Sequence, residues 1–154
     1  MSDAPLTLIA EPEGEAATDQ TRRAPDAGLL GLVMLARFHN IAADADQLAH
    51  DFREPGRQFG VPQILLAARQ IGLKAKQVAT DAARLAQTPL PALAIENDGS
   101  FVILARVDEQ QVLIQDPRVE RPQVLSLAEF EARWSGELIL FASRASLAGE
   151  LAKF

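Results

Sequence analysis

The residue types that carry most protein chemistry are scarce in this 154-residue chain. It has no cysteine and two histidines, His39 and His50. Without cysteine the chain cannot form a disulfide, a thiolate metal site or a cysteine nucleophile. A zinc site typically needs about three or four ligands in set spacing, which two histidines without an HExxH arrangement do not supply. We therefore predict no bound metal.

Other sequence patterns of enzymes are missing as well. None of the serines lies in a Gly-x-Ser-x-Gly elbow, and the segment 56–60 does not continue into the Gly-Lys-Ser/Thr of a phosphate-binding loop. The formal net charge of −6 argues against nucleic acid as a partner, since that needs a basic surface. The longest apolar run, 28–35, is too short to span a membrane, and the first residues do not resemble a secretory signal. We expect a cytoplasmic domain that does not insert into the membrane itself.

Apolar periodicity divides the chain into a helical half and a β half. Asp26 is the predicted N-cap of the first helix, and Pro62 fits the first turn of the third. The turn signals Asn97-Asp98-Gly99 and 108–110 separate apolar runs of β character. The predicted helices cover 26–40, 44–52, 61–71, 81–86 and 127–134. The predicted strands cover 73–78, which fits only loosely, 90–95, 101–107, 111–115, 123–125 and 137–142. Helices followed by antiparallel strands indicate an α+β fold.

The length of the chain fits one domain of ordinary size. Residues 1–24 are rich in proline and acidic residues, so we predict that they are disordered. The predicted domain covers 25–144. Residues 145–154 have a helical pattern but bring too few apolar residues for a core of their own.

Several short segments together resemble a known family. It is the papain-like cysteine-peptidase domain at the N-terminus of bacteriocin-exporting ABC transporters, which trims double-glycine leaders. The resemblance covers about residues 24–144 and implies helices packed on an antiparallel sheet. The segments that carry it are Asp26-Ala27-Gly28, Leu-Pro-Ala-Leu at 90–93, Phe-Val-Ile-Leu at 101–104, Asp116-Pro117 and Leu-Ser-Leu-Ala-Glu-Phe at 125–130.

The residues that do chemistry in that family are replaced in this chain. Ala27 stands at the position of the cysteine and Phe101 at that of the histidine, so Asp116 alone remains of the triad. The glutamine that would stabilise the oxyanion corresponds to Thr21, with Gln20 one place away. Nucleophile and base are both missing, which implies a degenerate peptidase domain and no enzyme activity. An active peptidase would cleave a double-glycine leader peptide, and we expect no cleavage.

This combination is similar to the peptidase-like domain of haemolysin-type, or RTX-toxin, type I secretion ABC transporters. Those domains keep the fold without the triad and bind the unfolded export substrate. The segments 35–40, 65–69, 73–78 and 130–136 resemble this branch, although many of its members retain the histidine. The tail 147–154 resembles the linker before the first membrane helix, which implies that 145–154 lead toward a transmembrane domain outside this chain. The implied location is the cytoplasmic face of the bacterial inner membrane.

Our main hypothesis is a non-catalytic domain that binds an unfolded RTX-type protein. Ala27 and Phe101 would make the former cleft more apolar, with Ile95 as a further contact, or else Phe101 simply fills and closes it. Phe38 and His39 match positions of substrate contact in the haemolysin-type domain and offer a second surface. RTX repeats are acidic, so a net charge of −6 predicts repulsion at long range.

The alternative hypothesis belongs to another class. The domain would be a regulatory or scaffolding module that docks on the transporter's own nucleotide-binding or membrane domains. In both cases the rest of the ABC transporter is a partner. We expect no cofactor in this domain, and ATP only at the nucleotide-binding domain that this chain lacks.

Overall fold

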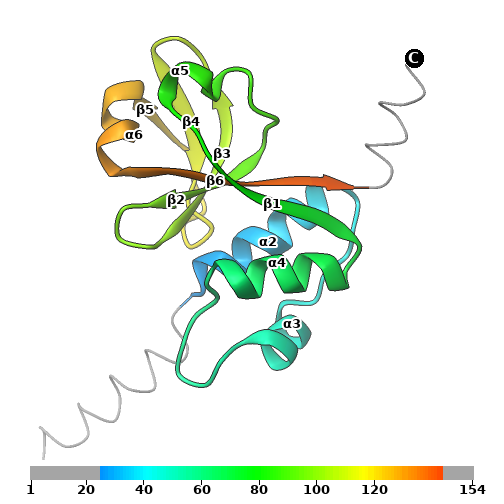
Figure 1. Ribbon diagram of the computed structural model, residues 1–154. Helices are drawn as coiled ribbons and strands as arrows, with labels where there is room; N and C mark the ends of the chain where they lie inside the picture. The colour runs from blue at the N-terminus through cyan, green and yellow to red at the C-terminus, as the bar shows by residue number, and fades with distance from the viewer. Residues whose placement is uncertain (1–24, 144–154) are drawn as a thin grey trace, which may run out of the picture.

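A six-stranded sheet with helices on both faces makes up the part of the chain that the computed structural model describes, residues 25–143. In Figure 1, three helices lie beneath β1 and β6, and two short ones lie on the opposite side. The first group is α2 (Ala27–Phe38), α3 (Ala45–Phe52) and α4 (Val61–Gln70). The second group is α5 (Ala82–Leu85) and α6 (Leu127–Arg133). None of the helices within 25–143 is long and apolar enough to cross a membrane.

Every pair of neighbouring strands in the sheet is antiparallel. The strand order is β1-β6-β2-β3-β4-β5, so the last strand of the described chain inserts between the first two. Consecutive strands from β2 to β5 form a meander, whereas β6 returns across the sheet. The strands are β1 (Leu73–Ala79), β2 (Ala92–Glu96), β3 (Phe101–Val107), β4 (Gln111–Gln115), β5 (Gln123–Ser126) and β6 (Trp134–Ser143). The predicted α+β fold is confirmed.

The sheet is buried on both faces, which explains why its central strands have apolar runs instead of a clean alternation. Along β3, Phe101 and Ile103 belong to the core shared with α2, α3 and α4. Val102 and Leu104 belong to the core on the opposite face. In that second core Phe130 of α6 stacks on Trp134, with ring centroids 5.3 Å apart.

The predicted order of elements is correct, and the differences lie at element ends. β2 begins at Ala92 instead of Leu90, because Pro91 has no N–H to donate to a neighbouring strand. β6 begins at Trp134, three residues before the predicted start. Gly136, at φ 92°, and a register shift opposite 95–96 let the chain turn from α6 straight into this strand. β1 is a regular seven-residue strand. The predictions for 1–24, including the oxyanion position, and for 145–154 lie outside the described residues.

Candidate functional site

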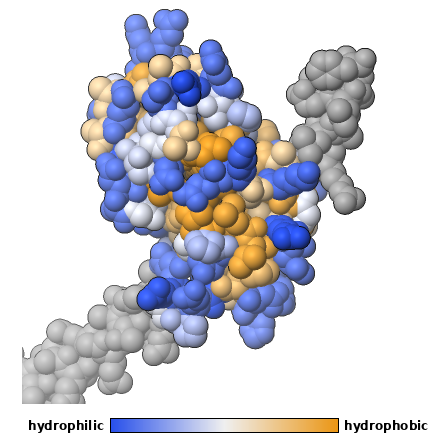
Figure 2. Space-filling model, in the orientation of Figure 1, coloured by the Kyte–Doolittle hydropathy of each residue, from blue (hydrophilic) through white to orange (hydrophobic). Residues whose placement is uncertain are grey.

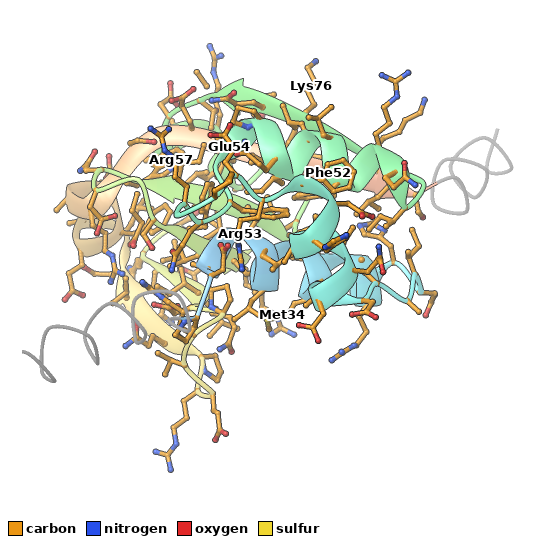
Figure 3. All side chains as sticks on the ribbon, turned by 90° about the horizontal axis from the view of Figure 1, so that it is seen from below. Met34, Phe52, Arg53, Glu54, Arg57 and Lys76 are labelled. Atoms are coloured by element: carbon orange, nitrogen blue, oxygen red, sulfur yellow. The ribbon has the colours of Figure 1, made fainter. Side chains whose placement is uncertain are left out.

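The start of α2 is held by Asp26, whose carboxylate is buried. Its Oδ1 accepts a hydrogen bond from the backbone N–H of Leu29 at 3.2 Å, so the predicted N-cap is confirmed. Its Oδ2 accepts from the backbone N–H of Phe59 at 2.9 Å and from Nη2 of Arg53 at 3.0 Å. Figure 3 shows Arg53 beside the beginning of α2. One carboxylate thus ties α2 to the segment between α3 and α4, and fixes where Ala27 lies.

Ala27 and Phe101 line one pocket of about 320 Å³ at this end of α2. Phe101 lies directly opposite Ile95 in the β2–β3 register. Its ring packs against the helix, since a Cβ placed on Gly28 would lie 3.2 Å from Cε2 of Phe101. The exposed fractions of Ala27 and Phe101 are 4% each and that of Ile95 is 9%. The structure therefore brings three of the candidate residues together, with Phe101 filling space beside the start of α2.

Asp116, the remaining triad position, is engaged by Arg118. Oδ1 of Asp116 accepts from the backbone N–H and from Nε of Arg118, at 2.9 and 3.0 Å, and Oδ2 accepts from Nη2 at 2.9 Å. These hydrogen bonds and the positive charge hold the pKa of Asp116 below its ordinary value. The pKa of Arg118 is raised in return. Arg118 also lines the pocket that contains Ala27 and Phe101.

A second ion pair lies near the first. Glu96, buried at the end of β2, accepts from Nε of Arg133, the last residue of α6. Arg133 contributes to the lowered pKa of Asp116, and Glu96 to the raised pKa of Arg118. Two carboxylates and two arginines thus pair beside the pocket of Ala27 and Phe101 and neutralise one another.

Phe38 and His39 lie at the opposite end of α2 from Ala27. A helix of twelve residues separates them by about 16 Å along its axis. Phe38 is 61% exposed, and its ring meets that of His39 edge to face at 5.3 Å. Partial burial lowers the pKa of His39, which favours the neutral imidazole. These two residues lie apart from Ala27 and Phe101, and their role in substrate contact stays a prediction.

At the three positions that the family resemblance relates to a triad, the side chains offer little for nucleophilic or acid–base chemistry. Ala27 presents a methyl group, Phe101 a ring without a basic nitrogen, and Asp116 a carboxylate that Arg118 already occupies. A carboxylate with a lowered pKa is also a poor proton acceptor near pH 7. Within 25–143, no cluster of His, Asp and Glu could hold a metal ion.

Arg118 and the Glu96–Arg133 pair are features of this region that the sequence analysis did not predict. A signal for Arg118 was present, because Asp116-Pro-Arg118 sets an arginine two residues after the carboxylate in a turn. The contacts of Asp26 left no such signal. Its partners Arg53 and Phe59 are 27 and 33 positions away, too far for any local pattern.

Comparison with known proteins gives one consistent result. A model of the Peptidase C39 family matches residues 16–146. The chain is 48% identical over 138 residues to the cyclolysin secretion/processing ATP-binding protein CyaB of Bordetella pertussis, covering 88% of this chain and 19% of that protein. It is 42% identical over 128 residues to the alpha-hemolysin translocation ATP-binding protein HlyB of Escherichia coli O157:H7, covering 82% and 18%. The chain thus spans about a fifth of the length of these relatives.

Solved structures agree on the fold. The N-terminal peptidase C39-like domain of a toxin secretion ATP-binding protein from Vibrio parahaemolyticus matches with a TM-score of 0.69 at 18% identity, covering 78% of this chain and 98% of that one. A double-glycine motif protease from an AMS/PCAT transporter, solved with its leader peptide, matches with a TM-score of 0.68 at 22% identity, covering 75% and 83%. The chain therefore belongs to the peptidase C39 family, and its curated relatives include ATP-binding proteins of toxin secretion.

Proposed function

We propose that this chain is the non-catalytic substrate-recognition domain of a type I secretion ABC transporter. It would bind the exported RTX-type protein, still unfolded, on the cytoplasmic face of the inner membrane. The observation that carries the proposal is the state of the three triad positions. Asp116 is committed to Arg118, while Ala27 and the buried ring of Phe101 stand at the positions of nucleophile and base.

The family membership supports a role in handling polypeptides. The relatives named above serve toxin secretion or translocation, and a protease of the same fold has been solved with a leader peptide. A domain of this fold that lacks a nucleophile and a free base keeps surfaces for a peptide but no means of cutting it. A transient, unfolded substrate is favoured because contact with an extended chain needs only apolar surface with polar edges.

The test compares two states of one substrate. The fluorescently labelled 154-residue chain is titrated with an RTX fragment in EDTA, where it is unfolded, and in calcium, where it is folded. We expect saturable binding in EDTA and at least about tenfold weaker binding in calcium. Equal binding of both states, or binding of neither, would contradict the proposal.

Absence of catalysis is tested separately. The chain is incubated with a double-glycine leader peptide, beside an active C39 peptidase as positive control, and the products are analysed by mass spectrometry. We expect intact peptide after prolonged incubation. A specific cut after the double glycine would refute the non-catalytic assignment and leave the binding assay unaffected.

One observation favours the alternative function, a regulatory module that docks within the transporter. Leu30, Met34 and Phe38 recur every four residues along α2, and Met34 and Phe38 are 36% and 61% exposed. Deleting residues 1–144 from the complete transporter separates the two functions. Lost secretion with unchanged ATPase activity favours recognition, whereas altered basal ATPase activity favours regulation.

A further inference from the structure

A groove of about 920 Å³ lies between α4 and the edge of the sheet, and it shares no lining residue with the pocket of Ala27 and Phe101. Its apolar lining comes mainly from Leu65 and Leu66 of α4, Leu73 and Ala75 of β1, and Phe141 of β6. The side chain of Leu66 is 56% exposed, which is a large fraction for a leucine. Figure 2 shows apolar surface in the middle of this face, where β1 crosses above the helices. The groove thus presents apolar side chains at the surface of the described residues.

The backbone beside the groove is that of an edge strand. Among the described residues β1 pairs with β6 alone, and it stands at the end of the strand order. On an edge strand, every second residue directs its N–H and C=O away from the sheet, where they can pair with an added strand. β1 is seven residues long, sufficient for several such hydrogen bonds. An extended chain could therefore add to the sheet while its side chains enter the groove.

The rim of the groove is positively charged. It includes Arg69, Lys74 and Lys76, all exposed. None of the three forms a salt bridge with a residue in 25–143. In Figure 3 the side chain of Lys76 points away from the ribbon. On a chain with a net charge of −6, three unpaired cations around one groove form a local region that attracts anions.

We propose that this groove, the β1–α4 groove, is the binding site for an extended acidic segment of the exported protein, which adds as a strand to β1. The proposal rests on the proposed function. RTX nonapeptide repeats place an aspartate two positions before an apolar residue, in a glycine-rich chain. In an extended strand, residues two apart face the same side, so the apolar side chain and the carboxylate reach the groove together, and the carboxylate meets Lys74 or Lys76 in its lining. The local cations overcome the long-range repulsion that the net charge predicts.

A second copy of the chain fits this edge less well. Two β1 strands paired edge to edge would set Lys74 and Lys76 of one copy close to the same residues of the other, and like charges across a strand pair are destabilising. Lysines on an edge strand are a common protection against such pairing. An acidic strand meets attraction where a second copy meets repulsion.

The test uses a calcium-free synthetic peptide of three RTX nonapeptide repeats and the complete 154-residue chain. The variant K74E/K76E reverses the charge of the rim. The control variant R106E/R121E changes the net charge by the same amount at two exposed positions. Arg106 lies on β3, which is three strands away from β1 in the sheet. A third variant, L66N, removes the exposed apolar side chain but not the charge. Circular dichroism and urea unfolding establish that each variant is folded.

We expect K74E/K76E to weaken peptide binding by at least about tenfold at low salt. The control R106E/R121E should weaken it by less than about threefold, and L66N by a factor between these two. The loss in K74E/K76E should shrink at high salt. A peptide N-methylated at alternate residues should bind poorly, because it cannot add to a strand edge.

Two outcomes overturn the assignment of this groove. If the wild type binds the peptide and K74E/K76E and L66N bind it equally well, the groove is not the site, although the proposed function stands. If sedimentation shows a dimer of the wild type that K74E/K76E abolishes, the groove belongs to a second copy. No binding by the wild type of either the peptide or a whole calcium-free RTX fragment refutes the proposed function itself.

Discussion

Replacing Asp26 with alanine tests how the start of α2 is positioned. The substitution removes the acceptor for the N–H of Leu29 and leaves the N–H of Phe59 buried without its partner. An N-cap contributes about 1 kcal/mol, and a buried N–H without a partner costs about 1–3 kcal/mol. The ion pair with Arg53 adds less than about 1 kcal/mol, because the arginine side chain is 33% exposed. We expect D26A to lower the free energy of unfolding by about 3 kcal/mol.

Asp44 provides a matched control. It is the N-cap of α3, and its Oδ1 accepts from the N–H groups of Asp46 and Gln47, all exposed. D44A therefore removes a cap of the same residue type without breaking a contact between distant segments, and should cost about 1 kcal/mol. In urea, a slope of about 1.5 kcal/mol/M converts these values to midpoint shifts of about 2 M and about 0.7 M.

The assay is urea unfolding followed by circular dichroism at pH 7, with the slope compared between variants. Arg53→Met retains the cap and the Phe59 hydrogen bond, so it should cost less than D26A. If D26A and D44A lower the free energy of unfolding by amounts that agree within about 0.5 kcal/mol, the Asp26 carboxylate acts only as a helix cap. Its role in joining α2 to the segment between α3 and α4 is then refuted.

Three further predictions concern the former catalytic position. Gly28→Ala should destabilise the chain despite the high helix propensity of alanine, because the added methyl group would lie 3.2 Å from Phe101 and 3.0 Å from a backbone carbonyl oxygen. Unfolding of G28A, F101A and the double variant measures the coupling energy between the two positions. A stabilising effect of G28A would contradict this prediction. Arg118 lowers the pKa of Asp116 in the folded state. The stability that this pair contributes is therefore fully present above the unfolded-state pKa of about 4. It is lost as the pH falls through the lower pKa of the folded state. The stability difference between wild type and D116N should therefore shrink from about pH 4 toward about pH 2, and a difference that grows on acidification would be inconsistent with the pair. The variant A27C/F101H should not cleave a double-glycine leader in a mass-spectrometric assay, because Arg118 still occupies Asp116; cleavage would show that this pair is easily displaced.

Much of the fold could be predicted because local patterns decide it. The N-cap Asp26, Pro62 in the first turn of α4 and the Asn97-Asp98-Gly99 turn act within a few residues and left clear signals. The start of β6 at Trp134 did not, because it depends on a register shift against β2 and on the left-handed conformation of Gly136. Both arise from pairing between strands that are distant in sequence.

The candidate site divides in the same way. Ala27, Ile95 and Phe101 were predicted to share a surface, and the β2–β3 register and the packing on α2 bring them together. The β1–α4 groove could not be predicted, because it depends on which strand lies at the sheet edge. The sequence gives strand positions but not the return of β6 between β1 and β2. Without that order, Lys74 and Lys76 are merely polar residues of a loosely patterned strand.

The pairing of cations in the two regions bears on where an acidic substrate would bind. Arg118 and Arg133, beside the former catalytic position, each hold a carboxylate of this chain, so an incoming carboxylate must displace Asp116 or Glu96 before it gains a partner. Arg69, Lys74 and Lys76 form no salt bridge within 25–143, so a carboxylate that approaches them breaks no ion pair among these residues. Because breaking a partly buried ion pair leaves an unpaired charge, we expect an acidic segment to bind more readily at the edge of the sheet than beside Ala27 and Phe101. The proposed binding at β1 therefore does not need a free cation near Ala27 and Phe101.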